Sequence, residues 1–446
     1  MNILHKILHS LFTVAISFSL CYTCKGQEQK VMPCAEALNR YLSPVGISNL
    51  NDDAWSQNIP AKEFDGKTVI ALGESTHGTK EFNQFRSEVI KRLILEDKVK
   101  IVTMETEYCY SIVLNDYLLS DQKDTLYKFI HMTGWAGIYK TQEIFDMLCW
   151  IKDYNLTRQI EDRVQVLGFD MQIPSVIAER LLKEFNSLQI KDAKLYNQLK
   201  DFYNLVKNNN RPKISTQQKS AYQQMAKSIH ALASEDCPET SCKPQFLSQL
   251  LEQTIDLQGT FGTFKNYMDV YRSKRDQYMA ENILSLYKQV NNTGGKLVVW
   301  AHNGHIAHAV LDGTKRMGMH LKDQLGDKYF AIGAAFDQGS VRIYDFNGLK
   351  RYVAFDYPPS AMPNAIEYVL THCKYPMFYF NVAAVRKDKG LKNCLDDHQY
   401  TRVIGSTYQP NQKKDYYKVP VNQCYDGMIF FKSTNAAEDV TKNLSR

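Results

Sequence analysis

The feature of this sequence that most limits its fold is a series of short apolar runs rich in Val, Ile and Ala. These runs do not alternate between apolar and polar positions, which is typical of strands buried on both faces of a sheet. They cover residues 68–73, 100–104, 164–169, 296–301, 329–335 and 377–381. Segments with helical periodicity separate them, such as residues 80–95, in which Phe82, Phe85, Val89 and Leu93 share one face.

This order of strands and helices predicts an α/β fold with a mostly parallel central sheet flanked by helices. Residues 174–288 are polar and helical in pattern, and we expect no strand there. We therefore expect one α/β domain over residues 30–446, with a large helical insertion, or cap, over residues 174–288.

Residues 1–26 differ from the rest of the chain. Lys6 precedes a mainly apolar run over residues 7–22, which is shorter and more polar than a membrane span of about 20 apolar residues. This pattern is typical of a secretory signal. We expect an exported protein, periplasmic or associated with the cell envelope, that is either cleaved near Gly26 or lipid-anchored at Cys21 or Cys24. An uncleaved anchor is the alternative.

An exported chain tolerates disulfides. The chain has ten cysteines, and removing Cys21 and Cys24 leaves eight. Cys237 and Cys242 bracket a short segment, which suggests a small loop closure. Cysteines 109 and 149 fall in apolar helical patterns and are expected to pack in the core. Beyond residue 26 no CxxC pair occurs, which argues against a zinc ribbon.

The charge balance argues against a nucleic-acid partner. Lys and Arg number 54 and Asp and Glu number 48, which gives a net charge of +6. No tract of five or more basic residues concentrates this charge, whereas a nucleic-acid binder usually shows a basic stripe. We expect a small-molecule partner instead.

Four of the expected strands run into a side chain that can carry chemistry: Glu74, Glu105, Asp170 and His302. In an open parallel sheet the carboxyl ends of the strands lie along one edge, which is where ligands bind. We therefore expect three carboxylates and an imidazole to converge on one cleft, although they are far apart in the sequence.

The segment Gly-Glu-Ser-Thr-His-Gly-Thr-Lys-Glu, residues 73–81, lies between an expected strand and helix. Its glycines allow a tight turn, and a carboxylate beside an imidazole is the usual way to build a general base, so we pair Glu74 with His77. Ser75 suggests a nucleophile elbow, but His77 stands where the second glycine of G-x-S-x-G belongs. For Glu81, a functional role and a favourable interaction with the helix dipole both stay open.

The segment Trp-Ala-His-Asn-Gly-His, residues 300–305, places two imidazoles, His302 and His305, at another strand end. With the nearby carboxylates these imidazoles could bind a metal, but the zinc signature H-E-x-x-H is absent. We assign them to catalysis or substrate contact and expect no metal and no cofactor. Arg86 and Arg275 could face a developing oxyanion or a carboxylate, although a solvated helix face is the simpler interpretation of each from spacing alone.

Together these motifs resemble the erythromycin esterase family. The family pattern Gly-Glu-x-x-His-Gly-x-x-Glu matches residues 73–81, and its Trp-Ala-His-Asn-x-His matches residues 300–305. Further similarity covers residues 168–172, 275–282 and 425–430, in the right order, so that the resemblance spans about residues 65–435. Tyr139 departs from it, because members often carry Trp there, and residues 190–260 match no recognisable pattern.

The resemblance implies metal-independent hydrolysis of the ester bond that closes a macrolide lactone ring. By this resemblance His77 is the general base that activates water, with Glu74 beside it. Arg86, Glu105 and His302 are further active-site residues, and Arg275 contributes to the same cleft.

We therefore predict an exported carboxylic ester hydrolase with a macrolide as the leading substrate and a possible role in antibiotic resistance. The predicted catalytic residues are His77, Glu74, His302 and Glu105, and the predicted substrate-binding residues are Arg86, Arg275, His305 and Asp170. Two alternatives stay open: a hydrolase of a different ester, and a metal- or ligand-binding protein without turnover.

Overall fold

The computed structural model of the protein describes residues 31–45, 59–122, 137–187, 192–209, 211–236, 243–261, 266–346, 348–408 and 415–440. The expected signal over residues 1–26, with Cys21 and Cys24, and the pair Cys237 and Cys242 lie outside these residues. None of the described helices is long and apolar enough to cross a lipid bilayer.

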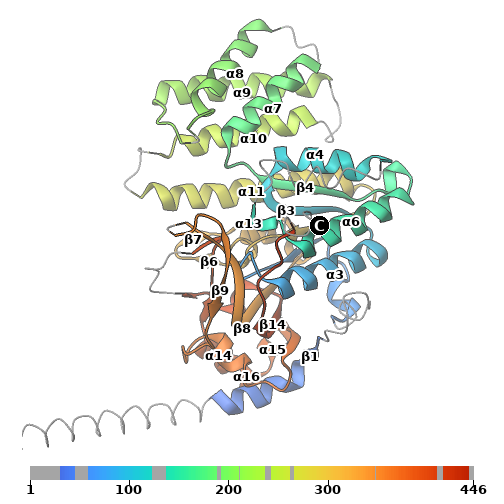
Figure 1. Ribbon diagram of the computed structural model, residues 1–446, viewed down its shortest axis with the longest axis vertical. Coiled ribbons are helices and arrows are strands. Elements are labelled where there is room, and N and C mark those ends of the chain that lie inside the picture. Colours follow the sequence, from blue (N-terminus) through green and yellow to red (C-terminus); the bar gives the residue numbers. More distant parts are fainter. Residues whose placement is uncertain are drawn as a thin grey trace, which may run out of the picture.

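A mixed, mostly parallel sheet runs through the molecule, flanked by helices (Figure 1). Its strand order is β1-β10-β14-β8-β2-β5-β3-β4, and β9 and β12 pair with the long strand β8. Six consecutive strands, from β14 to β4, are parallel. The bounds are β1 Ser43–Pro44, β2 Val69–Leu72, β3 Val99–Glu107, β4 Gln165–Asp170, β5 Lys296–Trp300, β8 Tyr329–Asp345, β9 Tyr352–Tyr357, β10 Met377–Asn381, β12 Thr407–Tyr408 and β14 Gly427–Thr434. Two short hairpins stand apart from this sheet: β6 Val310–Leu311 with β7 Thr314–Lys315, and β11 Tyr400–Arg402 with β13 Tyr416–Lys418.

The parallel strands are buried on both faces, as their unbroken apolar sequences predict. Alternate residues of β2 belong to different cores: Val69 and Ala71 face one side, and Ile70 and Leu72 the other. Helices α3 (Lys80–Glu96) and α6 (Gln142–Leu156) cover one face, and α11 (Tyr267–Asn291) and α13 (Met317–Leu325) cover the other. All six expected strands are present, which confirms the predicted α/β class.

Between β4 and β5 the described residues form helices without any strand. These helices are α7 (Pro174–Ser187), α8 (Ala193–Val206), α9 (Thr216–Asp236), α10 (Lys243–Gln258) and α11. Helices α7 to α10 form a separate layer at one end of the molecule, beyond α4 (Tyr108–Leu119) and α11 (Figure 1). We call this layer the cap. It lies on the side of the sheet where β3 and β4 are found.

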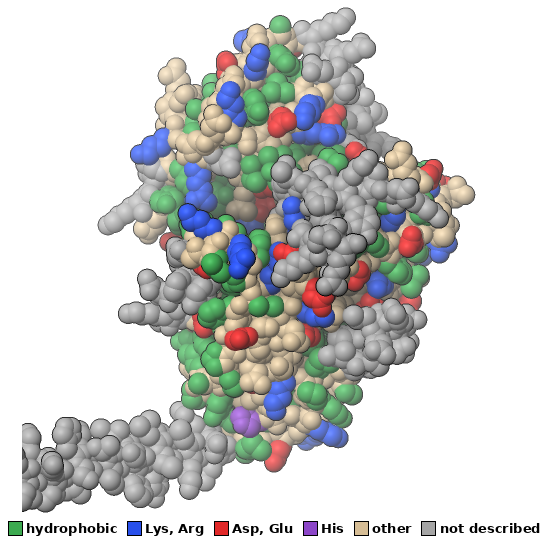
Figure 2. All heavy atoms as spheres, viewed as in Figure 1, with side chains coloured by type: hydrophobic (Ala, Val, Ile, Leu, Met, Phe, Trp, Pro, Cys, Tyr) green, Lys and Arg blue, Asp and Glu red, His purple; other side chains and the backbone are tan. Residues whose placement is uncertain are grey.

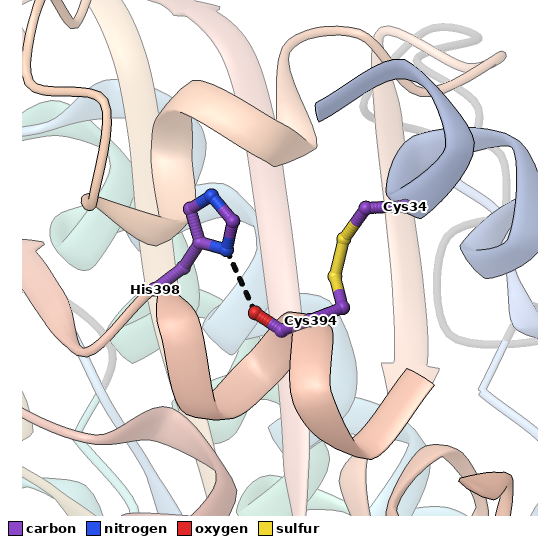
Figure 3. A group of neighbouring side chains, drawn as sticks. All are labelled: Cys34, Cys394 and His398. Atoms are coloured by element: carbon purple, nitrogen blue, oxygen red, sulfur yellow. Dashed lines mark hydrogen bonds between the residues drawn. A yellow bond between two sulfur atoms is a disulfide. The ribbon is translucent and has the colours of Figure 1, made fainter. Parts of the chain in front are cut away.

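The C-terminal part of the chain builds the opposite end of the molecule (Figure 1). It contains α14 (Ile366–Leu370), α15 (Val382–Lys387), α16 (Lys389–Asp397) and α17 (Val421–Cys424). The first described helical residues, 31–38, pack there, and a disulfide joins Cys34 to Cys394 of α16 (Figure 3). Cys109 is a buried free thiol and Cys149 is half-buried, as expected for residues that pack in the core.

Charged side chains are mixed over the face of the molecule shown in Figure 2, where Lys and Arg lie among Asp and Glu.

Candidate active site

The loop between β2 and α3 carries Glu74 and His77. His77 donates its Nδ1–H to Glu74 Oε1 over 2.7 Å. The other carboxylate oxygen accepts a hydrogen bond from the guanidinium of Arg86 on α3, which also donates to Asn83 Oδ1 at 2.7 Å. The Arg86 guanidinium lies 3.8 Å from the centre of the Trp300 ring. Glu74 is thus held between an imidazole and a fully buried, stacked guanidinium.

These contacts set the ionisation of the pair. Burial alone would raise the pKa of Glu74, but the charges of Arg86 and His77 hold this pKa below its ordinary value. Burial alone would lower the pKa of His77, but the Glu74 carboxylate raises it above its ordinary value. His77 Nε2 has no hydrogen-bond partner among the described residues, so this nitrogen is the one that can accept a proton.

Two glycines of the 73–81 segment permit close packing of its backbone. A Cβ on Gly78 would lie 1.7 Å from the backbone oxygen of Arg342 on β8, and a Cβ on Gly73 would lie 2.3 Å from Asn303 Oδ1. Neither glycine has a positive φ. From the sequence we expected these glycines to permit the backbone angles of a tight turn. The structure gives a different reason: other backbone and side-chain atoms occupy the space that a Cβ would need.

The second histidine loop follows β5. His302 caps the short helix α12 (Asn303–Ile306): its Nδ1 accepts from the N–H of Gly304 at 3.2 Å, and its Nε2–H donates to the Ser75 carbonyl at 3.3 Å. The ring centres of His302 and His77 are 5.3 Å apart. Burial, followed by the charge of His77, lowers the pKa of His302 to about 4. His302 is therefore neutral at physiological pH, with its proton on Nε2.

Glu105 connects this loop to the cap side of the sheet. Its Oε2 accepts from the backbone N–H of His302 at 2.9 Å. Its Oε1 pairs with Arg275 of α11 at 3.0 Å and with His305 Nε2 at 3.2 Å. Burial opposes ionisation of Glu105, but His305 and Arg275 hold its pKa well below the ordinary value.

Arg275 also binds Asp170 at the end of β4 through two hydrogen bonds of 3.1 and 2.7 Å. His305 donates its Nδ1–H to Asp276 Oδ1 at 2.6 Å. Burial alone would lower the pKa of His305, but Glu105 and Asp276 raise it to about 10, so the ring is a cation. Two cations, Arg275 and His305, are thus held in one network of ion pairs by Glu105, Asp170 and Asp276.

A cavity of about 510 Å³ opens beside this network, within the usual size range of small-molecule sites. Four of the expected residues line it: His77, Glu105, Asp170 and Arg275. The remaining wall comes from the ends of β3 and β4, from α4 and α11, from the short 3₁₀ helix Gly137–Tyr139, and from segments before α9 and after β11. These residues are Thr106, Glu107, Tyr110, Ile138, Gln172, Ile173, Arg211, Tyr271 and Ser406.

The other expected residues lie around this cavity in different ways. Glu74 and Arg86 are fully buried behind His77 and are absent from the cavity wall, so the position of Arg86 suits support of Glu74 and not substrate contact. His302 and His305 lie beside the lining residues, and each is partly exposed.

Two residues left open by the sequence have clear surroundings. Ser75 is fully buried, and its hydroxyl has no hydrogen-bond partner among the described residues. It therefore lacks both the base and the access that a nucleophile requires. Glu81 accepts from the backbone and side-chain nitrogens of Asn435 at 2.8 and 2.7 Å, which anchors the chain after β14.

Several residues of the site were not selected from the sequence. Asp276, the partner of His305, sits next to Arg275 in the recognised 275–282 segment, and Glu107 follows Glu105 at the spacing that places both on one face of a strand. These two signals were available. Tyr139, whose ring lies edge-on to His77 with centres 6.3 Å apart, was noted only as a departure from the family pattern, and Arg211 of the cap carries no signal.

One group in the described part of the chain brings three metal-ligand atoms within 4.8 Å of one another: Cys34, Cys394 and His398. The two cysteines form the disulfide, and His398 donates its Nδ1–H to the Cys394 carbonyl at 2.7 Å (Figure 3). This group borders a larger cavity of about 640 Å³. We place the candidate active site in the smaller cavity, because it contains the paired base and the convergent charges.

Comparisons with known proteins show the family of this chain. The family model described as "Erythromycin esterase" matches residues 94–434, a range that includes Glu105, Arg275 and His302 but begins after Glu74, His77 and Arg86. The chain is 24% identical over 392 residues to YbfO of Bacillus subtilis (strain 168), which is provisionally named a hydrolase. That match covers 79% of this chain and 82% of YbfO. The chain is also 24% identical over 326 residues to the erythromycin esterase type II of Escherichia coli, covering 64% of this chain and 73% of that protein.

Solved structures show the same fold. A Bacillus cereus protein superposes with a TM-score of 0.76 at 20% identity, over 92% of this chain and 99% of that chain. A mutant of the erythromycin esterase EreC in its open conformation superposes with a TM-score of 0.64 at 16% identity, over 86% of this chain and 95% of that chain.

Proposed function

Because the chain belongs to the erythromycin esterase family, we propose that it hydrolyses a carboxylic ester or lactone with a water molecule activated by His77. The family and its curated relatives indicate a hydrolase. The observation that carries the finer proposal is the Glu74–His77 pair, because His77 lines a cavity of small-molecule size and its Nε2 has no hydrogen-bond partner among the described residues.

In the proposed reaction, His77 Nε2 removes a proton from water while the water oxygen bonds to the ester carbonyl carbon. Glu74 keeps the other ring proton on Nδ1 and stabilises the imidazolium that forms. The C–O bond to the leaving alcohol then breaks, and the products are a carboxylic acid and an alcohol. Arg86 acts through Glu74, because its charge keeps that buried carboxylate ionised.

We assign the developing oxyanion to His302. Its ring is neutral, and its Nε2–H, which donates to the Ser75 carbonyl at 3.3 Å, would turn to the oxyanion as that charge forms, giving a hydrogen bond without an added charge. Asp170, Arg275 and Glu105 also line the cavity, and ion pairs join Arg275 to both carboxylates and His305 to Glu105.

A macrolide lactone is the leading substrate, supported by the name of the Escherichia coli relative. Another ester is the second candidate, since an identity of 24% leaves room for a different pocket. Mass spectrometry of macrolides of several ring sizes and of simple esters, after incubation with the purified protein, tests this proposal. We expect addition of one water to at least one class, and no hydrolysis of any compound would contradict the proposal.

The variant His77→Ala tests the assigned base. General-base catalysis contributes about 10²- to 10⁴-fold, so we expect kcat to fall by at least about 100-fold. A variant that kept most of its activity would contradict the assignment of His77. Elemental analysis of the wild type and of His302→Ala addresses the alternative of a metal-binding protein: one firmly bound metal ion per chain in the wild type that is lost in His302→Ala would favour it.

The compartment is also part of the proposal. We propose that the protein is exported to the periplasm or cell envelope, with the lipid anchor at Cys21 or Cys24 as a variant of this. The Cys34–Cys394 disulfide supports an oxidising compartment. Fractionation of cells that express the full chain tests it.

A further inference from the structure

Arg211 is a cation of the cavity wall that the mechanism above does not use. It lies in the segment between α8 and α9 of the cap, and it lines the same cavity as His77. Its side chain is exposed and makes no ion pair or side-chain hydrogen bond with the described residues. A ligand in the cavity can therefore bind this guanidinium without breaking an existing ion pair.

The guanidinium of Arg211 is held in place by an aromatic contact. It lies 5.3 Å from the centre of the Phe261 ring, within the range of a cation–π interaction. The Phe261 ring packs against Tyr271 of α11, with ring centres 5.3 Å apart, and Tyr271 also lines the cavity. The backbone N–H of Arg211 donates to Asn209 Oδ1 at 3.0 Å. A guanidinium that rests on an aromatic ring keeps its N–H groups available for a ligand.

The carboxyl groups of the same wall have other partners. Glu105 and Asp170 both pair with Arg275. Glu107 accepts two backbone N–H groups through Oε1, at 2.6 and 3.1 Å. Burial, followed by the charge of Asp170, raises the pKa of Glu107 well above its ordinary value, although Arg275 and these N–H groups act in the opposite direction. Arg211 therefore stays a positive charge without a carboxylate partner in this wall.

An unpaired guanidinium favours an anionic group of matching shape. Its planar fork can donate to both oxygens of a carboxylate. The wall already carries three carboxyl groups, so that several added negative charges would meet repulsion. One unpaired cation therefore matches a group with a single negative charge, as a carboxylate has at neutral pH.

We propose that Arg211 is a specificity-determining residue that binds a carboxylate of the substrate, so that the compound hydrolysed is an ester that also carries a carboxylate. This inference rests on the proposed function and defines the class of its second candidate, an ester other than a macrolide. The carboxylate lies at the Arg211 end of the cavity, and the ester carbonyl lies beside His77. The sequence of the cap matches no family pattern, so the cap is where a preference special to this chain is expected.

The experiment compares the monomethyl and dimethyl esters of glutaric, adipic and suberic acid. The two esters of each acid share a carbon chain and a scissile bond, but only the monomethyl ester carries a carboxylate. The three chain lengths vary the distance between the carboxylate and the ester carbonyl. At one length or more, we expect the wild-type kcat/KM for the monomethyl ester to exceed that for the dimethyl ester by about tenfold, the factor that one hydrogen bond to a charged group supplies.

Two variants of Arg211 test whether this residue causes the preference. Arg211→Gln removes the charge, and we expect the ratio of the two kcat/KM values to fall to within about twofold of one. The change should come mainly from a higher KM for the monomethyl ester, because a contact far from the reacting bond contributes equally to ground-state and transition-state binding. Arg211→Glu should bring the ratio below one, since its carboxylate repels the anionic ester.

Lys213→Gln is the matched control. Lys213 is an exposed cation of the same segment, two residues from Arg211, and it is not part of the cavity wall. This variant changes the total charge of the cap by the same amount as Arg211→Gln. The ratio of the two kcat/KM values should stay at the wild-type value in it.

A wild type without preference for the monomethyl ester at any chain length would overturn this inference and leave the proposed function standing. A preference that survives in Arg211→Gln, or that falls equally in Lys213→Gln, would overturn it as well. Hydrolysis of macrolides without hydrolysis of any of these esters would have the same meaning. If the wild type hydrolysed neither these esters nor any macrolide or simple ester, the proposed function itself would be wrong.

Discussion

The chemistry of single residues in this site depends on how charge is divided among them. Glu74, Glu105 and Asp170 each pair with a cation, supplied by Arg86, His305 and Arg275 respectively. The two imidazoles of the reaction, His77 and His302, have pKa values shifted in opposite directions, although their ring centres are only 5.3 Å apart. His77 faces a carboxylate and attracts a proton, whereas His302 faces backbone groups and stays neutral.

This difference predicts the pH dependence of activity at the residue scale. The base must be unprotonated at Nε2, and Glu74 raises the pKa of His77, so kcat/KM should increase with pH through a midpoint above 6.5. The pKa of His302 is about 4, so His302 should add no step between pH 5 and 8. A pH profile of kcat/KM in the wild type and in His302→Asn checks this. The variant should be slower with the same midpoint, and a midpoint at or below 6.5 in the wild type would contradict the assignment of His77.

The same pKa shift has the opposite consequence for stability. A raised pKa in the folded state means that the charged form of His77 stabilises the fold. This contribution is fully present below the unfolded pKa of the ring, and it is lost as pH rises through the folded value. Activity and the stabilising contribution of His77 therefore change in opposite directions over this range.

At the scale of elements, the site depends on loops that pack without space between them. The β2–α3 loop lies against β8 and the chain after β14: Gly78 O accepts from the backbone N–H groups of Arg342 at 2.8 Å and Ala437 at 2.9 Å. The β5–α12 loop is joined to it by the Asn303 N–H, which donates to the Glu74 carbonyl at 2.7 Å. The relative position of the two histidines is set by these backbone contacts.

Gly78→Ala should therefore displace His77. The added methyl group would meet the Arg342 carbonyl, which a strand holds in place, so we expect a loss of about 1–3 kcal/mol in the free energy of unfolding, typical of overpacking. We also expect a fall in kcat of at least about tenfold, since about 1 Å of misplacement can cost 100-fold. Gly405→Ala is the control, because Gly405 lies near the cavity wall with no atom within 4 Å of its added Cβ. Urea unfolding and kcat in both variants check this, and equal behaviour of the two would contradict it.

The elements were predictable to different degrees. Five of the six strands of the parallel core were identified because burial on both faces leaves an unbroken apolar run, as in β2 and β5. The sixth, β14, was not among the expected strands. Strand β9, Tyr-Val-Ala-Phe-Asp-Tyr, was missed although most of its residues are apolar or aromatic; it pairs with β8 and is mostly half-buried or exposed. Glu105, expected at a strand end, lies inside β3, since the strand continues to Glu107.

Site residues that directly follow a strand could be predicted from the sequence. Site residues contributed by a helix or by the cap could be predicted less well. Glu74, Asp170 and His302 were identified by their place after apolar runs, and the structure brings them to one edge of the sheet. The position of Arg86 behind Glu74, away from the cavity, depends on the rotation of α3 against Trp300, which spacing along the chain does not give. Arg211 enters the wall from the cap, whose sequence has no recognisable pattern.

At the scale of the whole molecule, the active site and the disulfide lie in different regions. The cavity is bordered by the ends of β3 and β4 and by the cap side, whereas Cys394 belongs to α16 at the opposite end of the molecule (Figure 1). The disulfide joins residues 360 positions apart and ties the first described helical residues to the C-terminal part. The disulfide should therefore change the free energy of unfolding, through the unfolded chain, and leave the catalytic rate unchanged.

We accordingly expect Cys34→Ser/Cys394→Ser to lower the free energy of unfolding by roughly 3–5 kcal/mol, since a disulfide that closes so long a loop removes much entropy from the unfolded state. The value of kcat at 25 °C should stay within about twofold of the wild type, because neither cysteine lines the cavity of about 510 Å³ that contains His77. Urea unfolding with and without dithiothreitol checks this. The reductant should bring the wild type to the stability of the double variant and leave that variant unchanged.

Cys373→Ser, which replaces a free thiol near Ala35, is the control for altered packing. If dithiothreitol left the unfolding midpoint of the wild type unchanged, the disulfide would contribute nothing to the free energy of unfolding. If kcat fell in the double variant, the disulfide region and the active site would be coupled.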